Sequence, residues 1–139
     1  MSRNSDTAEA IRFAGYAGLF DIRDAGRDTI RPGAFARTLA ERSAPLPLLW
    51  QHRPDQQIGE IETIAEDARG LRVIARIDRT ASKAARMLLA RAVNGLSFGY
   101  RARAARRTGP DRELIDIDLF EVSLVTHPLQ HGARVHFIA

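Results

Sequence analysis

The stretch Val93–Tyr100, with the sequence VNGLSFGY, lies where a helical pattern ends and an alternating, extended pattern begins. In a strand through this stretch, Ser97 and its flanking glycines, Gly95 and Gly99, lie on one face, and the large apolar residues lie on the other. We interpret the bare face as room for a substrate backbone to approach a nucleophilic hydroxyl. Taken alone the pattern is weak, because a bulge or tight bend has the same composition.

Outward from this stretch, alternating apolar residues and turn signals predict about seven short strands and two helices. The expected strands are 11–17, 46–52, 58–64, 71–77, 96–104, one or two within 112–126, and 134–138. The expected helices are 34–42, which follows Pro32 and Gly33, and 81–93, with Thr80 as its N-cap and Gly95 as its stop. We expect a loose tail over 1–10, a loop over 21–33, and one mostly-β domain over 11–139, built as an antiparallel sheet or closed barrel.

Composition excludes several classes of protein. The 139 residues contain no cysteine, which rules out a disulfide framework, a thiolate nucleophile and a zinc-thiolate site. Residues 1–10 lack the apolar centre of a secretion signal, and no run approaches the ~18 apolar residues of a membrane span, so we expect a soluble, intracellular protein. The net charge is +4, and arginine carries nearly all of the positive charge. This balance permits contact with nucleic acid or an acidic partner without requiring it.

The segment Gly95–Gly99 also matches Gly-x-Ser-x-Gly, the nucleophile elbow of α/β hydrolases. The elbow needs a strand before the serine and a helix after it, with the acid and then the histidine following in the chain. Here a helix precedes Ser97 and a strand follows, and no alternating βα units are present. The order of elements therefore disfavours the elbow.

A serine nucleophile needs a base and, behind the base, an orienting acid. Of the four histidines, His52 closes an apolar strand after Trp50, where the alternative is an exposed strand-end histidine. Glu121 opens the apolar run Glu121–Thr126, where the common alternative is an ion pair with an arginine. We predict Ser97, His52 and Glu121 as the candidate catalytic residues.

Several stretches, in this order, resemble the prohead proteases of tailed bacteriophages, capsid-maturation serine proteases related in fold to the herpesvirus assembly proteases. The stretches span most of the chain and are Phe13–Ala17, Ile30–Phe35, Pro47–His52, Ile58–Gly59, Gly70–Leu71, Gly95–Tyr100 and Glu121–Thr126.

The resemblance implies a closed antiparallel β-barrel with helices around it, Ser97 as nucleophile and His52 as general base. Glu121 stands where the herpesvirus relatives have a second histidine, and Asp116 and Asp118 remain rivals for the acid role. The relatives place oxyanion donors in the loop corresponding to Thr126–Gln130, although they use an arginine pair that this loop lacks. We expect Gly95, Gly99, Thr126 and His127 to bind substrate, and we expect no cofactor or metal.

The resemblance also implies substrates, partners and a location. Family members cut scaffolding segments and the leading region of the major capsid protein, inside the immature shell in the bacterial host cytoplasm. A homo-oligomer is compatible with this setting. Because many members carry a scaffold-like extension and this chain stops soon after the last expected strand, a separate scaffold or a trimmed form is expected.

Three other functions stay open. Arg101–Arg107 suggests a nucleic-acid-binding barrel, but it lacks interleaved aromatic residues for base stacking. A catalytically silent capsid component is disfavoured only because all three candidate catalytic residues are present. A metal site built from His127, His131 and His136 is weaker still, because Pro128 and Gly132 prevent one helical face from carrying them.

Overall fold

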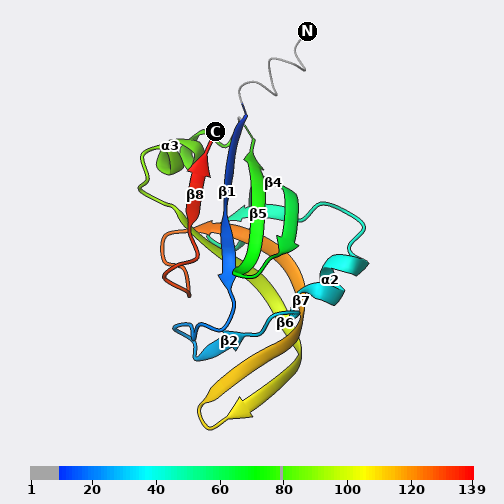
Figure 1. Cartoon of the computed structure of the whole chain (residues 1–139). Helices are drawn as coiled ribbons and strands as arrows, with labels where there is room; N and C mark the ends of the chain where they lie inside the picture. Colours follow the sequence, from blue (N-terminus) through cyan, green and yellow to red (C-terminus); the bar gives the residue numbers. More distant parts are fainter. Residues whose placement is uncertain (1–9, 79) are drawn as a thin grey trace.

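One curled β-sheet of eight strands forms most of the protein, and two short helices lie beside it (Figure 1). The computed structural model describes residues 10–78 and 80–139, so the predicted tail falls, except for Ala10, outside the described residues. The elements are β1 Ile11–Leu19, β2 Asp28–Ile30, α2 Ala36–Glu41, β3 Pro47–Trp50, β4 Arg53–Glu66, β5 Gly70–Ile77, α3 Ser82–Leu89, β6 Gly95–Thr108, β7 Asp111–Val125 and β8 Val135–Ile138.

Strand β7 organises the sheet. The strand order is β2-β7-β3-β4-β5-β1-β8, and β6 pairs with β7 outside this path. The β6–β7 ladder is antiparallel, whereas β2 and β3 both pair with β7 in parallel. The predicted antiparallel arrangement is therefore wrong at β3, and β2 lies in a segment predicted as loop. The expected closed barrel does not form among the described strands. The described strands form an open, curled half-barrel, in which one isolated bridge joins Gly95 to Arg134.

The predicted hairpin of two alternating runs is confirmed as β4 and β5. They pair antiparallel, from Gly59 opposite Ile77 to Glu66 opposite Leu71. Strand β4 begins earlier than expected, at Arg53, because its polar first residues pair with β3. Strand β3 correspondingly ends at Trp50, two residues earlier than expected. The last two residues of the predicted strand, Gln51 and His52, therefore lie in the turn between β3 and β4.

The hollow of the curled sheet holds the hydrophobic core. Fully buried side chains reach it from several strands and include Phe13, Leu48, Val73, Leu96, Ile117 and Leu124. Phe98 of β6 packs edge-on against the buried Phe35, with 5.2 Å between the ring centroids. The apolar face of β6 is thus anchored in the core, as the sequence pattern predicts, and this fixes the direction of the opposite face.

The two helices are shorter than predicted, and the predicted loop over 21–33 contains β2. In α3 the N-cap is Ala81 and makes no side-chain cap bond, so the assignment of Thr80 as the cap is wrong. The helix also ends well before Gly95, at Leu89 with Ala90 as its C-cap, and the next residue, Arg91, adopts a left-handed backbone with φ 57°. Within the described residues, no helix combines the length and apolar character that crossing a membrane requires.

Candidate active site

The β6–β7 ladder sets Ser97 and Glu121 on one face of the sheet. Ser97 lies opposite Ser123, and Gly99 lies opposite Glu121, one alternate position further along. Directly opposed residues of an antiparallel pair point to the same face, so all four belong to one surface. Ser97 is only 7% exposed. It borders a small pocket with Ala17, Phe98, Leu129 and Gln130.

The space beside the two glycines is filled by the protein itself. A Cβ atom at Gly99 would come within 2.3 Å of Glu121 Oε2, and a Cβ atom at Gly95 would come within 2.7 Å of the Pro128 ring. The interpretation of these glycines as open room for substrate is therefore wrong. Gly99 admits the carboxylate of Glu121 to the face of Ser97, and Gly95 admits the loop that follows β7.

His52 is the second residue of a two-residue turn. Trp50 pairs with Arg53 across this turn, and Gln51 and His52 both have positive φ angles, 53° and 61°. Two positive φ angles are typical of a type I′ hairpin turn, which glycine and asparagine favour. A strained backbone of this kind costs on the order of 1–3 kcal/mol per residue and persists only where the surroundings hold it.

The turn places the His52 ring against Glu121. His52 Nδ1 lies 2.6 Å from Glu121 Oε2, and Ser123 Oγ donates to Glu121 Oε1 at 2.7 Å. The carboxylate side chain is only 12% exposed, whereas the His52 side chain is 42% exposed. The hydrogen bond that His52 makes to the Glu121 carboxylate raises the pKa of His52, and partial burial opposes this rise.

The second ring nitrogen of His52, Nε2, does not contact Glu121 and can bond to another group. With the Nδ1 proton directed to a carboxylate, Nε2 of the neutral ring carries the lone pair and can accept a proton. No hydrogen bond joins the Ser97 hydroxyl to this ring, both residues being within the described part of the chain. The structure therefore brings base and acid into contact, with Ser97 on the same face as the acid.

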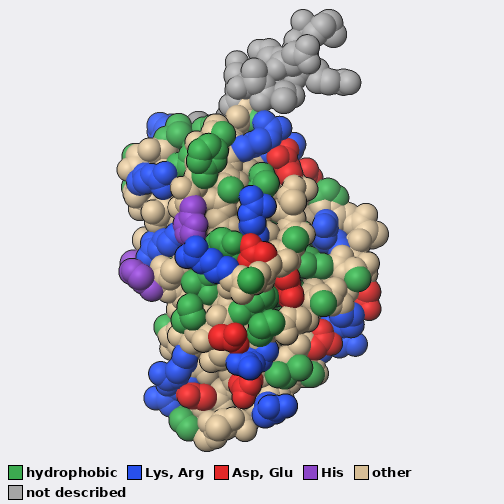
Figure 2. All heavy atoms as spheres, in the orientation of Figure 1, with side chains coloured by type: hydrophobic (Ala, Val, Ile, Leu, Met, Phe, Trp, Pro, Cys, Tyr) green, Lys and Arg blue, Asp and Glu red, His purple; other side chains and the backbone are tan. Residues whose placement is uncertain are grey.

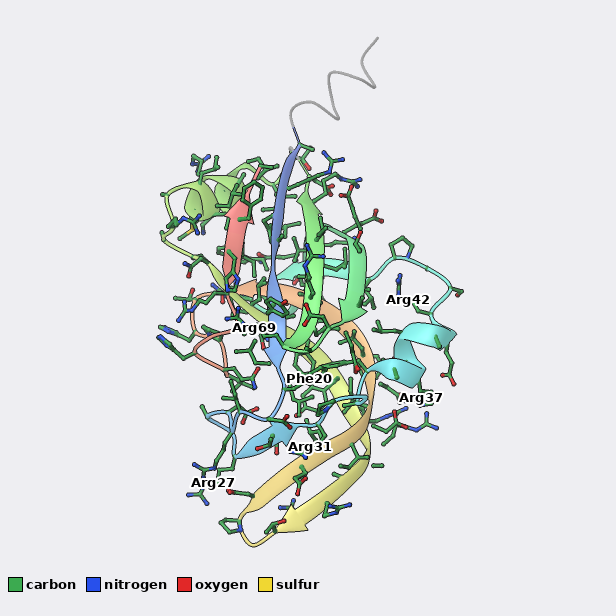
Figure 3. All side chains as sticks on the ribbon, in the orientation of Figure 1. Phe20, Arg27, Arg31, Arg37, Arg42 and Arg69 are labelled. Atoms are coloured by element: carbon green, nitrogen blue, oxygen red, sulfur yellow. The ribbon has the colours of Figure 1, made fainter. Side chains whose placement is uncertain are left out.

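The rival acids belong to a different cluster. Arg37 of α2 reaches β7 and bonds to Asp116 at 3.0 Å and to Asp118 at 2.7 Å (Figure 3). Arg101 of β6 bonds to Asp118 at 2.9 Å. These guanidinium groups, Arg37 foremost, lower the pKa of Asp118 to about 2. Both aspartates are thus engaged in ion pairs with arginines, whereas Glu121 contacts His52.

The loop after β7 is tied down at both ends. Gln51 accepts from Thr126 N at 3.1 Å and donates to Thr126 Oγ1 at 2.6 Å, so both groups of Thr126 are occupied. At the other end, the buried Gln130 accepts from Leu19 N at 2.6 Å and donates to Leu19 O at 2.9 Å. His127, between them, is exposed. The sequence did not single out Gln51, Ser123 or Gln130, because polar side chains in such positions carry no local signal.

Neither the C-terminal histidines nor the Arg101–Arg107 run forms a recognisable metal or nucleic-acid site among the described residues. His136 packs its ring near Tyr16, with 5.8 Å between centroids, and the described residues include no group of three or more His, Cys, Asp or Glu suited to a metal ion. In the Arg101–Arg107 run, Arg101 and Arg103 pair with Asp118. Figure 2 shows basic and acidic side chains interspersed on the visible face, without a continuous basic surface.

The sequence of the chain is similar to those of known phage proteins. The family model described as caudovirus prohead serine protease matches residues 1–139. The prohead protease of Enterobacteria phage HK97 is 33% identical over 92 residues, which is 63% of this chain and 41% of that protein. The chain thus matches about two fifths of the length of this curated relative.

Solved structures show the same fold. The bacteriophage T4 capsid assembly protease, gp21, has a TM-score of 0.66 at 14% identity, covering 84% of this chain and 82% of that one. The varicella-zoster virus protease has a TM-score of 0.63 at 19% identity, covering 91% and 63% of the two chains. A protease of Kaposi's sarcoma-associated herpesvirus, bound to a hexapeptide phosphonate inhibitor, has a TM-score of 0.66 at 17% identity, covering 94% and 65%.

Proposed function

The protein belongs to the caudovirus prohead serine protease family, and on this basis we propose that Ser97, His52 and Glu121 form its catalytic triad and that it cleaves capsid and scaffold proteins during prohead maturation. The observation that carries the proposal is the contact of 2.6 Å between His52 Nδ1 and Glu121 Oε2, on the face that also carries Ser97. It is the base–acid half of a triad, in which an acid fixes the tautomer of a histidine.

The proposed mechanism is acyl transfer. Ser97 Oγ attacks the scissile carbonyl carbon while His52 Nε2 takes the hydroxyl proton, and the proton then passes to the leaving amine. Water repeats the sequence, with His52 again as base, and releases the acyl group from Ser97. Glu121 stays ionised, orients the ring and stabilises its charged form.

The oxyanion needs donors that are unoccupied when the substrate arrives. Thr126 N is bonded to Gln51, which leaves amides further along the Thr126–Gln130 loop, including that of His127, as the proposed donors. The same loop, which packs against Gly95 through Pro128, borders the proposed path of the substrate backbone. The proposal needs no cofactor or metal, since acid, base and nucleophile are all side chains.

We further propose that the substrates are the scaffolding protein and the leading region of the major capsid protein, cut inside the immature capsid in the host cytoplasm. The name of the HK97 relative and that of the T4 protease support an action in capsid assembly. Homo-oligomerisation stays a prediction. Nucleic-acid binding as the main activity is not favoured, because Arg101 and Arg103 are paired with Asp118.

The test is co-expression of the protein with its coat and scaffold proteins. We expect Ser97→Ala to lower the cleavage rate by about 10⁴-fold or more with the melting temperature retained, and His52→Ala to lower it to a similar extent. The control is Ser43→Ala, an exposed serine in the loop before β3, which should cleave normally. Normal cleavage by Ser97→Ala would contradict the assignment.

A further inference from the structure

The Gln51–His52 turn is an unfavourable place for a catalytic base unless other residues hold it. Both residues adopt the left-handed backbone, yet neither is glycine. A two-residue hairpin loop with these side chains has no local preference for the type I′ geometry. The conformation of the base must therefore be imposed from outside the hairpin, and β7 is the strand that lies against it.

Gln51 provides one set of contacts to β7. Its backbone N donates to Leu124 O at 3.0 Å, which continues the parallel β3–β7 ladder by one residue. Its side-chain amide holds Thr126 through two hydrogen bonds, one to the backbone N and one to the hydroxyl. The first residue of the turn is thus fixed to β7 through both main chain and side chain.

Ser123 provides the second set, and it touches both members of the base–acid pair. Its hydroxyl accepts from His52 N at 3.1 Å and donates to Glu121 Oε1 at 2.7 Å. The side chain is fully buried, at 0% exposure. Because a hydroxyl has one proton and the His52 backbone N–H is a donor, the proton of Ser123 goes to the carboxylate.

We propose that Ser123 is a positioning residue for the proposed catalytic triad, with the Gln51–Thr126 contact as its support. The proposal rests on the proposed function. Ser123 holds the His52 backbone in its left-handed conformation and occupies Oε1 of Glu121, which leaves Oε2 to His52 Nδ1. One buried atom on β7, Ser123 Oγ, thereby positions both His52 and Glu121.

The first test uses two variants that lose the hydroxyl but differ in volume. Ser123→Ala leaves a gap, whereas Ser123→Cys nearly keeps the shape and is only a weak hydrogen-bonding partner. With purified coat or scaffold protein as substrate, we expect both variants to lower kcat by about 10- to 100-fold, with KM within about twofold. Recovery of kcat in the Cys variant would show that only volume matters and would overturn the proposal.

The second test does not depend on cleavage. The proton between His52 Nδ1 and Glu121 Oε2 should give a downfield ¹H NMR resonance in the wild type, which Glu121→Gln removes. We expect Ser123→Ala to shift or broaden this resonance at a temperature well below its unfolding transition, where the variant is fully folded. An unchanged resonance together with a wild-type kcat would overturn the positioning role.

The third test separates the backbone of Gln51 from its side chain. Glycine adopts positive φ without steric cost, so Gln51→Gly should keep the turn and the melting temperature while removing the contact to Thr126. We expect kcat of Gln51→Gly to fall severalfold, and the His52 resonance to shift as in Ser123→Ala. Wild-type kcat with an unshifted resonance would overturn the supporting role of Gln51.

These outcomes are distinguishable from failure of the proposed function. If Ser97→Ala still cleaves, the triad itself is wrong, and the positioning role falls with it. If Ser97→Ala is inactive but Ser123→Ala matches the wild type in kcat and resonance, the triad stands and only the positioning role is overturned.

Discussion

His52 Nδ1 contacts Glu121 Oε2 at 2.6 Å although 69 residues separate the two in sequence, and the carboxylate stands in the space left by the missing side chain of Gly99. The contact joins the turn after β3 to strand β7 on the face of the β6–β7 ladder that carries Ser97. The substitutions below test what this contact does and what holds it in place.

Glu121→Gln keeps the shape of the side chain and removes its negative charge. We expect kcat/KM to fall by at least about 10²-fold, yet by less than in Ser97→Ala, because an orienting acid alone is worth less than the nucleophile. Steady-state cleavage of purified coat protein measures this. The matched control is Asp118→Asn on the same strand, whose carboxylate pairs with arginines, and it should keep full activity. The reverse result would mean that the acid was misassigned.

The pH dependence follows from the raised pKa of His52. The base must be neutral to accept a proton, so activity should rise with pH through a midpoint above 6.5, the ordinary value for histidine. In Glu121→Gln the principal cause of the rise is gone, so the midpoint should move down. A ¹H NMR titration of His52 measures the same pKa directly. A flat activity profile from about pH 5 to 9 would argue against histidine as the base.

The same shift makes a prediction for stability. A raised pKa means that the folded state holds the proton more tightly, so the stabilising charge pair is fully present below pH 6.5 and is lost as pH rises through the raised pKa of His52. The stability difference between wild type and Glu121→Gln should therefore be larger at about pH 5.5 than at about pH 9. Urea unfolding at both values checks the sign, and an equal difference would contradict the pairing.

Gly99→Ala should separate activity from stability. Its Cβ atom would displace the Glu121 carboxylate, the flexible end of a side chain, so the fold should lose no more than about 1 kcal/mol. Activity should fall about as far as in Glu121→Gln, because the carboxylate no longer reaches His52. The control is Gly26→Ala, whose Cβ atom would contact only Asp24, at 3.3 Å. Full activity in Gly99→Ala would show that the position of the carboxylate is unimportant.

Gln130→Leu tests the anchor of the loop after β7. The buried amide bonds to both backbone groups of Leu19 and to Ile22 O, and leucine would leave these groups without partners. We expect the free energy of unfolding to fall by about 1–3 kcal/mol. Gln57→Ala, at an exposed position, should change it by less than about 0.5 kcal/mol. Equal effects of the two substitutions would show that the anchor is not specific.

Sequence patterns located the strands that alternate regularly. Strand β5 and the anchored face of β6 follow from period-two alternation, which reflects burial on one side of a sheet. Strand β2 was missed because its three residues form a strand only where β7 and Arg112 meet them: Arg112 bonds to Asp28 at 2.9 Å. The end of β3 was misplaced for a similar reason, since the turn at His52 is imposed by β7.

In the candidate site too, some features follow from the sequence pattern and others only from contacts in space. Glu121 and its rivals Asp116 and Asp118 look alike in sequence, and only the positions of Arg37 and His52 in space separate them. The two glycines beside Ser97 were recognised as significant, but what fills their space comes from β7 and the loop after it. Ser123 has no sequence signal because its role lies in two contacts, one of them to a residue 71 positions away.

The parallel pairing of β3 with β7 has a consequence for the order in which activity is acquired. Ser97 and Glu121 belong to one hairpin whose strands are joined by a short turn, so they come together through local chain closure. His52 arrives only when a distant strand docks, a step that pays more loop-closure entropy. The chain can therefore hold the proposed nucleophile and the proposed acid in register before the proposed base reaches them. If the proposed triad is correct, cleavage needs the docking of β3 against β7.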